Sequence, residues 1–505
     1  MTITNKNILR GFLILSYVAI IAAILLGLGN IYSYLNTGAN RSTMLHLKPK
    51  QDNQYVPEVT FSPLNNKGRA LDAQNLKAIE TDYLYAWYVK HTAYKTNTPQ
   101  GIADYYTEHA RQSILDVIKM NQKENIWLDS TTLKHNISIG FFSEDGKLVS
   151  LTDTDVLEYK RIYKDGILVY ETKEQATYNV ILLLEDGFWR IRHITKNASK
   201  PFNTTKTHTT KPNLNVKGIN YYPQATPWDM YGANFNAKVI DSDFKLIKHT
   251  GLNCIRIFVP YTDFGKETIK QDRLKKLITV LNLAKQNQLK VMVTLFDFYG
   301  DYAVVNWTLN QKHAKTLVAA LKNHEALWAW DIKNEPDLDF KSRGKEKVIA
   351  WLEHILYTVK SNDTLHPVTI GWSNAKSGVL LHDKVDMVTF HYYENLDLLG
   401  NTYNELKNQV SSKPLVLTEF GISSNRGFWH PFGNTKKDQA KYHKQAQHIF
   451  EKHNIPFMSW TLYDFNNIPK EVAGRLPWVK QTQANYGFID KKGETKPAFQ
   501  HIAKK

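Results

Sequence analysis

Cysteine is nearly absent from this chain, since Cys254 is the only one among 505 residues. No disulfide can form within the chain, so a disulfide-stapled fold is excluded. Cys254 lies inside an apolar run, and we expect an inert core thiol rather than a nucleophile. A chain of this length buries a large core without staples, so an oxidising compartment is compatible with the sequence.

Motifs for nucleotides and metals are missing as well. No Gly-x-Gly-x-x-Gly or P-loop sequence follows an apolar run, which argues against a nucleotide site. The pair His324-Glu325 lacks the second histidine of a zinc motif. The histidines His443, His448 and His453 are spaced five apart, the wrong spacing for a shared metal site on a helix. We therefore expect no cofactor and no metal.

Acidic residues are fewer than basic ones: the chain has 48 Asp and Glu but 64 Lys and Arg, which gives a formal net charge of +16. The lysines are scattered, and many alternate with Asp, Glu and Asn on expected helix faces. We interpret them as a solvated surface and expect no nucleic-acid partner. Attraction to an anionic polysaccharide or to lipid headgroups is the alternative interpretation.

One hydrophobic run is long enough to cross a bilayer. Residues 11–28 are almost all apolar, and Lys6 and Arg10 precede them. About 18 to 20 residues suffice for a crossing, whereas the apolar part of a secretory signal has about 7 to 15. We predict a single-pass signal anchor in the cell membrane at residues 1–35, with the rest exported to the periplasmic or extracellular side. A signal peptide cleaved near residues 36–39 is the alternative.

Composition divides the exported part into four segments. Residues 36–68 are rich in Asn, Pro, Lys and Gln and are expected to form a tether. Residues 69–196 carry helix-periodic and hairpin patterns and are expected to form a small α+β domain. Residues 197–213, mostly Lys, Thr, Asn and Pro, have the composition of a linker to a larger domain at 214–505.

The small domain is predicted to have helices followed by a curved antiparallel sheet, which gives a cone. Helices are expected over 70–90 and 101–120, because apolar residues recur there at three and four positions. Asp-Gly turns bound the predicted strands, which are 135–142, 148–152, 155–163, 167–178, 179–184 and 188–194.

This order of elements resembles the nuclear-transport-factor-2-like (SnoaL-like) superfamily, as do the endings Leu-Leu-Leu-Glu-Asp-Gly and Phe-Trp-Arg-Ile-Arg-His. The resemblance implies an enzyme, a ligand pocket or a module for self-association. His109, His135 and His193 are candidates to line a pocket in such a cone, although lone histidines are more often structural.

The larger domain contains eight continuous apolar runs separated by helix-periodic segments. The predicted strands are 216–221, 253–259, 290–296, 327–332, 367–370, 387–391, 415–418 and 457–461, and helices are expected over 274–286, 314–321, 346–359 and 438–451. Continuous rather than alternating runs indicate a parallel sheet buried on both faces. Eight repeats in about 290 residues are typical of a (β/α)8 TIM barrel. The fold class is thus α/β, and an open doubly wound sheet is the alternative.

Two glutamates end apolar runs of this domain: Glu335 in Trp-Asp-Ile-Lys-Asn-Glu-Pro and Glu419 in Pro-Leu-Val-Leu-Thr-Glu-Phe-Gly. Carboxyl ends of barrel strands meet at one face, where such enzymes keep their active sites. Two carboxylic acids facing each other across a sugar are what cleavage of a glycosidic bond requires. The aromatic content of 12% suits this chemistry, because flat sugar faces stack on aromatic rings.

These motifs resemble the clan A glycoside hydrolases, closest to the family-five β-mannanase and β-glucanase barrels, over residues 216–500. The resemblance implies that Glu335 is the acid/base after Asn334 on strand four and that Glu419 is the nucleophile on strand seven. It assigns substrate-site roles to Arg256 on strand two, His391 and Tyr393 on strand six, and Trp460 on strand eight. Strand three departs from the family, offering Asp297 and Tyr299 where a histidine is common. Trp228 and Trp372 follow strands and are further candidates to contact sugar.

The sequence therefore predicts a membrane-anchored retaining β-glycosidase that cleaves a β-mannan or β-glucan polysaccharide with two glutamates. Two alternatives remain open: a membrane-tethered transglycosylase that uses the same covalent intermediate, and a non-catalytic carbohydrate-binding or assembly protein of polysaccharide synthesis or export. Expected partners are the polysaccharide or oligosaccharide, the membrane through the N-terminal helix, and a second copy through the small domain.

Overall fold

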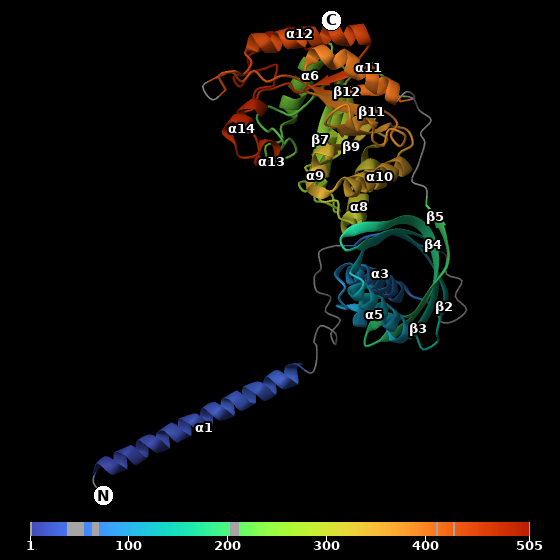
Figure 1. The fold of residues 1–505 in the computed structure, drawn as a ribbon, viewed down its shortest axis with the longest axis vertical. Helices are drawn as coiled ribbons and strands as arrows, with labels where there is room; N and C mark the ends of the chain where they lie inside the picture. Colours follow the sequence, from blue (N-terminus) through green and yellow to red (C-terminus); the bar gives the residue numbers. More distant parts are fainter. Residues whose placement is uncertain are drawn as a thin grey trace. The chain divides into compact units, whose positions relative to one another are not determined.

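The structure is a computed structural model that describes residues 3–37, 55–62, 70–202, 212–410, 413–427 and 430–503. Its contacts group into two units (Figure 1). The first reaches from the N-terminus to Pro201, and the second runs from Phe202 to the C-terminus and includes Tyr55–Pro57.

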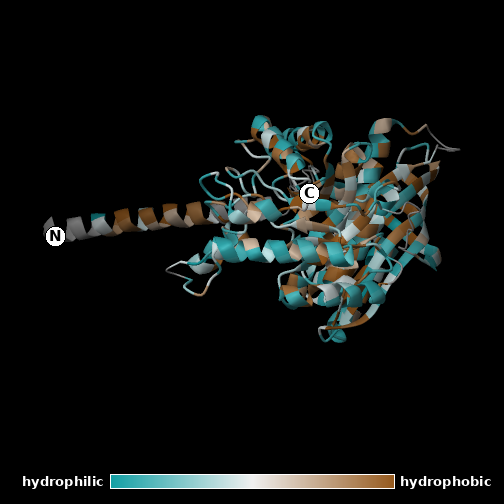
Figure 2. Ribbon diagram, turned by 90° about the horizontal axis from the view of Figure 1, so that it is seen from above, coloured by the Kyte–Doolittle hydropathy of each residue, from teal (hydrophilic) through white to brown (hydrophobic). Residues whose placement is uncertain are grey.

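The first helix, α1 (Ile3–Thr37), is continuous. Its stretch Arg10–Leu28 is long and apolar enough to cross a bilayer, and none of it is buried by the rest of the chain. Figure 2 shows this apolar character along the helix that leads from the N-terminus. A signal sequence passes the same test of length and composition, so α1 is a candidate for the predicted anchor. Part of the alternative cleavage site, at 38–39, lies outside the described residues.

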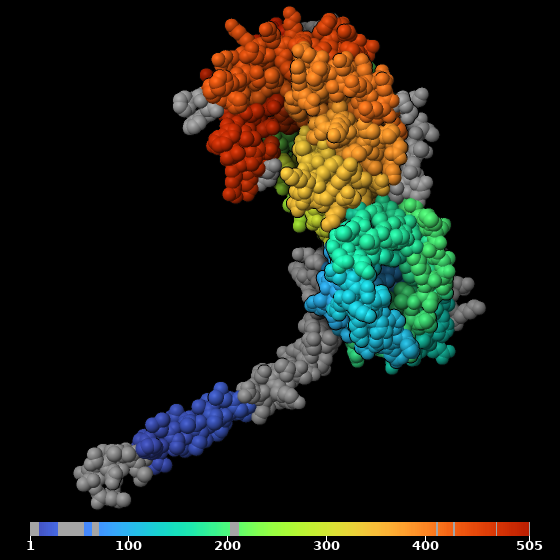
Figure 3. Space-filling model, viewed as in Figure 1, coloured from blue at the N-terminus to red at the C-terminus, as the bar shows by residue number. Residues whose placement is uncertain are grey.

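In its described residues, the small domain packs three helices against one curved sheet. The helices are α3 (Ala73–Thr96), α4 (Ile102–Tyr105) and α5 (Glu108–Lys123). The sheet has the order β1 (Glu58–Phe61), β2 (Ile126–Phe142), β3 (Leu148–Lys164), β4 (Ile167–Glu185) and β5 (Phe188–Pro201). The pair β1–β2 is parallel and the others are antiparallel. The long strands curve around α3, and the space-filling view is hollowed between them (Figure 3).

The strands of this sheet are longer than the sequence pattern predicted. The runs 148–152 and 155–163 form one strand, β3. A β-bulge joins them: the register is irregular between Asp153 and Val156, and Asp155 adopts a left-handed φ of 52° there. Such a bulge bends a strand without ending it. The runs 167–178 and 179–184 are likewise joined in β4. Strand β1 lies in the segment expected to be a tether, and the end of β5 lies in the segment expected to be a linker.

Eight parallel strands close the predicted barrel in the second unit. In order they are β6 (Lys217–Asn220), β7 (Cys254–Pro260), β8 (Lys290–Asp297), β9 (Leu327–Asn334), β10 (Val368–Trp372), β11 (Val388–Tyr392), β12 (Leu415–Phe420) and β13 (Phe457–Ser459), which pairs back with β6. Every pair is parallel. The (β/α)8 prediction is confirmed, and the open-sheet alternative is wrong.

Helices lie between these strands along the chain, and α13, α14 and η5 follow the last strand. The longer ones are α6 (Ala237–His249), α7 (Gln271–Gln286), α8 (Trp307–Leu321), α10 (Lys345–Asn362), α11 (Leu399–Gln409) and α12 (Lys436–His453). The short ones are α9 (Phe340–Arg343), α13 (Lys470–Ala473), α14 (Pro477–Gln483) and the 3-10 turns η1 (Val304–Asn306), η2 (Pro336–Asp339), η3 (Ser377–Val379), η4 (Leu396–Leu398) and η5 (Pro497–His501). Local chemistry fixes their ends: α12 begins with a Thr435–Asp438 capping box and ends at Asn454, whose φ is 53°.

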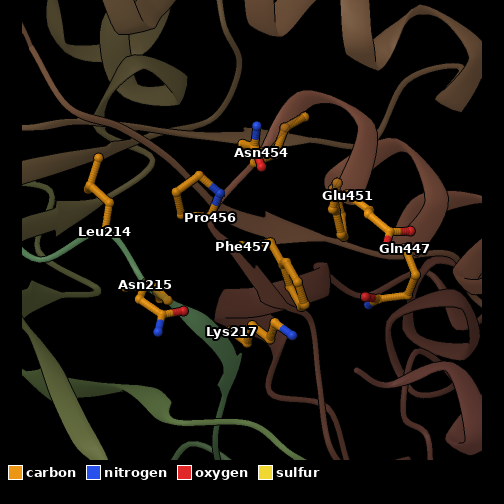
Figure 4. Close-up of a pocket in the computed structure, with 11 residues that line it drawn as sticks. Leu214, Asn215, Lys217, Gln447, Glu451, Asn454, Pro456 and Phe457 are labelled. Atoms are coloured by element: carbon orange, nitrogen blue, oxygen red, sulfur yellow. The ribbon is translucent and has the colours of Figure 1, made fainter. Parts of the chain in front are cut away.

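Apolar side chains fill the barrel at the amino ends of its strands. Cys254, Met292, Met387, Val416 and Met458 belong to this buried cluster, and burial raises the pKa of the Cys254 thiol well above its ordinary value. Burial in this cluster therefore favours the protonated thiol over the thiolate. A hollow of about 370 Å³ lies at the same end, lined by the start of β6 and the end of α12 (Figure 4).

Candidate active site

A cleft of about 530 Å³ opens at the carboxyl ends of the barrel strands. It is lined by side chains that include Tyr222, Trp228, Phe258, Asp297, Tyr299, Lys333, Asn334, Glu335, Asp339, Tyr393, Glu419, Trp460 and Tyr486. Both glutamates singled out from the sequence are among them. Strand ends far apart in the chain meet here because the barrel is closed, which is how this fold builds active sites.

Arg256 is the centre of the polar network under the cleft. Its side chain is fully buried on β7 and pairs with Glu419 through Nη1. Its Nε and Nη2 donate to Asp331 Oδ2 at 3.1 and 2.6 Å. Nη2 also donates to Asn334 Oδ1 at 2.8 Å, and Nη1 to Asn220 Oδ1 at 3.1 Å. One guanidinium on β7 thus holds residues from three other strands in fixed positions.

A glycine on β10 makes room for this network. A Cβ at Gly371 would lie 2.7 Å from Arg256 Nη2 and 3.1 Å from Asp331 Oδ2. The Gly371 N–H also donates to Asp331 Oδ1 at 2.8 Å. Asp331 therefore faces the guanidinium and a backbone donor together, and any side chain at position 371 would force them apart.

Glu335 projects from a strained backbone position just after β9. Its φ of 46° and ψ of 50° lie in the left-handed region, which is unfavourable for a residue with a Cβ. Its N–H donates to Gly371 O at 2.7 Å, which anchors the turn to β10, and Pro336 follows at once. Strain of this kind persists where the surroundings fix it, and it is concentrated at functional sites.

His391 lies between the two glutamates. Its Nδ1 is 2.8 Å from Glu335 Oε1 and 3.5 Å from Glu419 Oε2. A carboxylate can only accept, so His391 donates from Nδ1 to Glu335. On the other side, the Tyr393 hydroxyl donates to Glu419 Oε2 at 3.0 Å. One atom from each of Glu335, His391 and Glu419 lies within 4.8 Å of the others.

The positively charged and hydrogen-bonding groups around Glu335 lower its pKa by more than its burial raises it. Burial alone raises the pKa of Glu335, whereas the hydrogen bond and charge of His391, together with Arg256 and Lys333, lower it, and the net direction is down. For the Tyr393 hydroxyl, burial and the nearby Glu419 raise the pKa far above the ordinary value. Tyr393 therefore stays protonated and remains a hydrogen-bond donor.

Asp297 is a third carboxylate in the cleft. It lies at the end of β8, is 6% exposed, and accepts a hydrogen bond from the Tyr222 hydroxyl at 3.2 Å. Burial raises its pKa to about 6, although Lys333, Arg256 and Tyr222 oppose that rise. Asp297 therefore titrates close to neutral pH.

We predict that Asp297→Asn stabilises the barrel increasingly as the pH rises. The native pKa lies above that of the unfolded chain, so the stability that protonation supplies is present below about pH 4 and lost by about pH 6. The gap in free energy of unfolding between variant and parent should widen by about 2 kcal/mol from pH 4 to pH 7. Urea unfolding at several pH values measures it. Asp383→Asn, at an exposed loop carboxylate, is the control, and a gap that is constant with pH would contradict the prediction.

Aromatic rings form the walls of the cleft. Trp460 and Trp228 lie with ring centroids 6.3 Å apart, and Tyr222 stacks on Phe258 at 5.2 Å. Tyr299 also lines the cleft, but its hydroxyl donates to Asn310 at 2.7 Å and its ring stacks on Trp351 at 5.0 Å. Trp372 is 1% exposed, packs near Phe340 and does not belong to the cleft lining.

Some residues of the site were not singled out in the sequence. Asp331 and Asn220 complete the Arg256 network, while Lys333, Asp339 and Tyr486 line the cleft. Asp331 did carry a signal, because a charged residue inside a continuous apolar strand needs a buried partner. Asn220 and Tyr486 carried none, because polar residues at strand ends and in loops are common.

Glu335, His391 and Glu419 have the donor types and spacing of a metal site in the described part of the chain. The Arg256 guanidinium already pairs with Glu419, however, and a metal cation beside it would be repelled. The chemistry of this donor set therefore fits a pair of acids better than a metal centre.

The fold and the paired carboxylates define a glycoside-hydrolase type of barrel. Residues 202–466 match the family described as Cellulase (glycosyl hydrolase family 5). The match spans more than half of the chain, and the chain belongs to this family.

The matches to individual proteins have low sequence identity. Mannan endo-1,4-beta-mannosidase A of Emericella nidulans is 24% identical over 204 residues, which cover 32% of this chain and 52% of that protein. Beta-glucuronidase of Chlorocebus aethiops is 23% identical over 281 residues, or 52% of this chain and 40% of that protein. The solved exo-beta-1,4-mannosidase Op5Man5 from Opitutaceae bacterium strain TAV5 has a TM-score of 0.47 at 18% identity and covers 56% of this chain and 58% of its own. The chain spans about half the length of the curated relatives it matches.

Proposed function

We propose that this chain is a retaining β-glycoside hydrolase that acts on a polysaccharide, with Glu419 as nucleophile and Glu335 as acid and base. The observation that carries the proposal is the spacing of the two carboxylates, which bring one oxygen each within 4.8 Å. Retaining enzymes hold their carboxyl groups about 5 Å apart, whereas inverting enzymes leave about 6.5 to 9.5 Å for a water molecule.

In the first step, a Glu419 oxygen attacks carbon one of the sugar while the bond from that carbon to the leaving oxygen breaks. Protonated Glu335 gives its proton to the leaving oxygen, so the departing sugar leaves as an alcohol. The product is a glycosyl ester on Glu419. In the second step, Glu335 takes a proton from water, and the water oxygen displaces Glu419 with a second inversion. A sugar hydroxyl in place of water would give transglycosylation by the same residues.

The surrounding contacts suit these roles. Arg256 and Tyr393 bind the two oxygens of Glu419. They stabilise its charged form and orient it, as a nucleophile requires. Arg256 also binds the Asn334 amide oxygen, so the amide NH2 group faces away and is suited to donate to a sugar hydroxyl.

The acid step requires a proton on Glu335, whose pKa is held low without substrate. A sugar seated in the cleft excludes water, and this removal of solvent disfavours the charged carboxylate. We therefore infer that bound substrate protonates the acid more readily than the free site does. The free enzyme should accordingly be most active on the acid side of neutral pH.

His391→Ala tests this role of the histidine. Removing the donor and its charge raises the pKa of Glu335, so Glu335 keeps its proton to higher pH. The alkaline limb of the kcat/KM profile is therefore expected to move to higher pH, whatever the loss in maximal rate. His249→Ala, at an exposed histidine at the end of α6, is the control. If the alkaline limb does not move, His391 does not lower the pKa of Glu335, and this prediction is wrong.

Charge indicates the class of sugar. Among the described residues, four carboxylates line the cleft, Asp297, Glu335, Asp339 and Glu419, against Lys333 alone, with Arg256 beneath. This excess of negative charge disfavours a uronic acid and favours an uncharged sugar. Among the relatives, the mannan mannosidases agree with this preference better than the β-glucuronidases do. β-Mannan is therefore the first candidate substrate and β-glucan the second.

A panel of polysaccharides tests the substrate class. The full chain in detergent is incubated with β-1,4-mannan, a β-glucan and a β-linked polyuronate, and reducing ends are counted over time. We expect release from a neutral polymer, and the Glu335→Gln variant should show no release. Preferential cleavage of the polyuronate would overturn the charge argument.

We further propose that α1 holds the enzyme at the cell membrane, because Arg10–Leu28 is apolar and unburied. Covalent attachment to such a span resists removal by alkaline carbonate. Protein that carbonate washing releases from membranes would contradict the anchor.

A further inference from the structure

The concave side of the small domain holds a cluster of charged side chains that the proposed hydrolysis does not use. The cluster lies where α3 faces β3, β4 and β5, and the domain is hollowed between its strands in Figure 3. Glu158 on β3 is at its centre and is only 4% exposed. The Tyr178 hydroxyl donates to it at 2.9 Å.

Two lysines balance the carboxylates of this cluster. Lys160 lies 3.5 Å and Lys196 3.8 Å from Glu158. Lys196 also pairs with Glu174 at 2.6 Å. The side chains of Lys160 and Lys196 are 26% and 34% exposed, so the cluster reaches solvent at this end. Two cations and two anions therefore neutralise one another here.

Lys90 on α3 adds a third cation to this balanced set. Its Nζ lies 3.7 Å from the centre of the Trp87 ring. Within the described residues, no carboxylate lies within ion-pair distance of it, and its charge acts on Glu158, Lys160 and Lys196 only from further away. Lys90 is thus the lysine of this cluster that no described carboxylate contacts directly, and its side chain is partly buried.

His91, the next residue on α3, is also incompletely satisfied. It is 7% exposed, and its Nδ1 lies 2.7 Å from Ser130 Oγ. Its Nε2 is buried and has no hydrogen-bond partner in the part of the chain that the structure describes. A buried polar group of this kind needs a partner, and a ligand that fills the site would supply one.

The pKa values of Lys90 and His91 are consistent with a site that binds an anion. Burial lowers the pKa of Lys90 to about 8, with Glu158 opposing it and the neighbouring lysines adding to it. Burial, and then Lys90, lower the pKa of His91 to about 3, so the imidazole is neutral. An anion beside Lys90 would remove the electrostatic penalty that its ammonium carries.

We propose that the concave side of the small domain is a second binding site, which takes a ligand carrying one carboxylate beside the Lys90 ammonium. One carboxylate would give Lys90 the ion-pair partner that the described residues do not supply. A phosphate group carries about −1.5 to −2 at neutral pH and would leave the cluster overcharged in the other direction. The carboxylate can come from an acidic sugar or from a small organic acid. Such a site would let the domain bind an acidic saccharide while the barrel cleaves a neutral one.

Calorimetric titration of the full chain in detergent, in a buffer without carboxylate or phosphate, tests the site. The ligands are glucuronate, its neutral relative glucose, glucose 6-phosphate and butyrate. We expect saturable binding of glucuronate and none of glucose. Lys90→Met keeps the length of the stem over Trp87 and should weaken glucuronate binding by at least about tenfold, which is the scale of one charge-assisted contact. Lys123→Gln, at an exposed lysine on α5, should leave binding unchanged.

The comparison of butyrate with glucuronate identifies the kind of molecule that supplies the carboxylate. Binding of butyrate with the same dependence on Lys90 supports a small organic acid, and binding of glucuronate alone supports an acidic sugar. Lys90→Arg keeps the charge and should retain binding, so the site can be tested even if Lys90→Met unfolds. The proposal is overturned if neither glucuronate nor butyrate shows saturable binding, if Lys90→Met binds them as the parent does, or if glucose 6-phosphate binds more tightly than both. None of these outcomes depends on hydrolysis by the barrel.

Discussion

Glu419→Ala is expected to lower kcat on an aryl β-glycoside at least about ten-thousandfold, because it removes the carboxylate that is proposed to form the covalent intermediate. Sodium azide should restore turnover. The small anion fits the space that the carboxylate leaves and attacks the same face of the sugar. Because this attack inverts the centre only once, the product should be the α-glycosyl azide, which NMR identifies by its one-bond C1–H1 coupling constant.

Glu405→Ala, at an exposed glutamate on α11, is the matched control and should keep full activity without a response to azide. Glu335→Ala should respond differently, since azide would then enter from the side of the acid and give the β-azide. A Glu419→Ala enzyme that retains a tenth of its activity, or that yields the β-azide, would sink the assignment of the nucleophile.

The second large effect is expected for Arg256→Met, which removes a fully buried guanidinium from Asp331 and Glu419. Methionine keeps an apolar stem of similar length, but both carboxylates lose their counter-charge in a dry environment. Removing one partner of a buried ion pair typically costs about 3 to 5 kcal/mol. The free energy of unfolding of the barrel, followed by urea and tryptophan fluorescence, should fall by that amount.

A second substitution separates charge from packing. In Arg256→Met/Asp331→Asn, one of the two unpaired charges is gone, so part of the lost stability should return. Arg273→Met is the control, because Arg273 pairs with a carboxylate that is 55% exposed and such surface pairs contribute at most about 1 kcal/mol. A loss no greater than that of Arg273→Met would mean that the network is not held by charge.

The barrel was predictable because its strands are buried on both faces. Each strand then appears as an unbroken apolar run, and the eight runs with helices between them leave few alternatives. The glutamates were predictable for a related reason: a closed parallel barrel brings all carboxyl strand ends to one face. Glu335 and Glu419 needed only their positions at strand ends to be expected there together.

Contacts between distant positions were not predictable in this way. Nothing in the local pattern indicates that Gly371 must lack a side chain so that Arg256 and Asp331 can meet beside it. Trp372, one residue on, follows the same apolar run as a sugar-binding aromatic would, yet it is buried. In the small domain, Asp155 has the local composition of a turn, and only the neighbouring strands hold it in a bulge.

The anomer of the first product formed tests the central claim most directly. The full chain is mixed with a β-linked substrate that it cleaves, and proton NMR follows the anomeric signals before mutarotation mixes them. Two carboxylates held this close should act by double displacement, so the β-anomer should appear first. If the α-anomer appears first, a single displacement by water has occurred, and Glu419 is not a nucleophile.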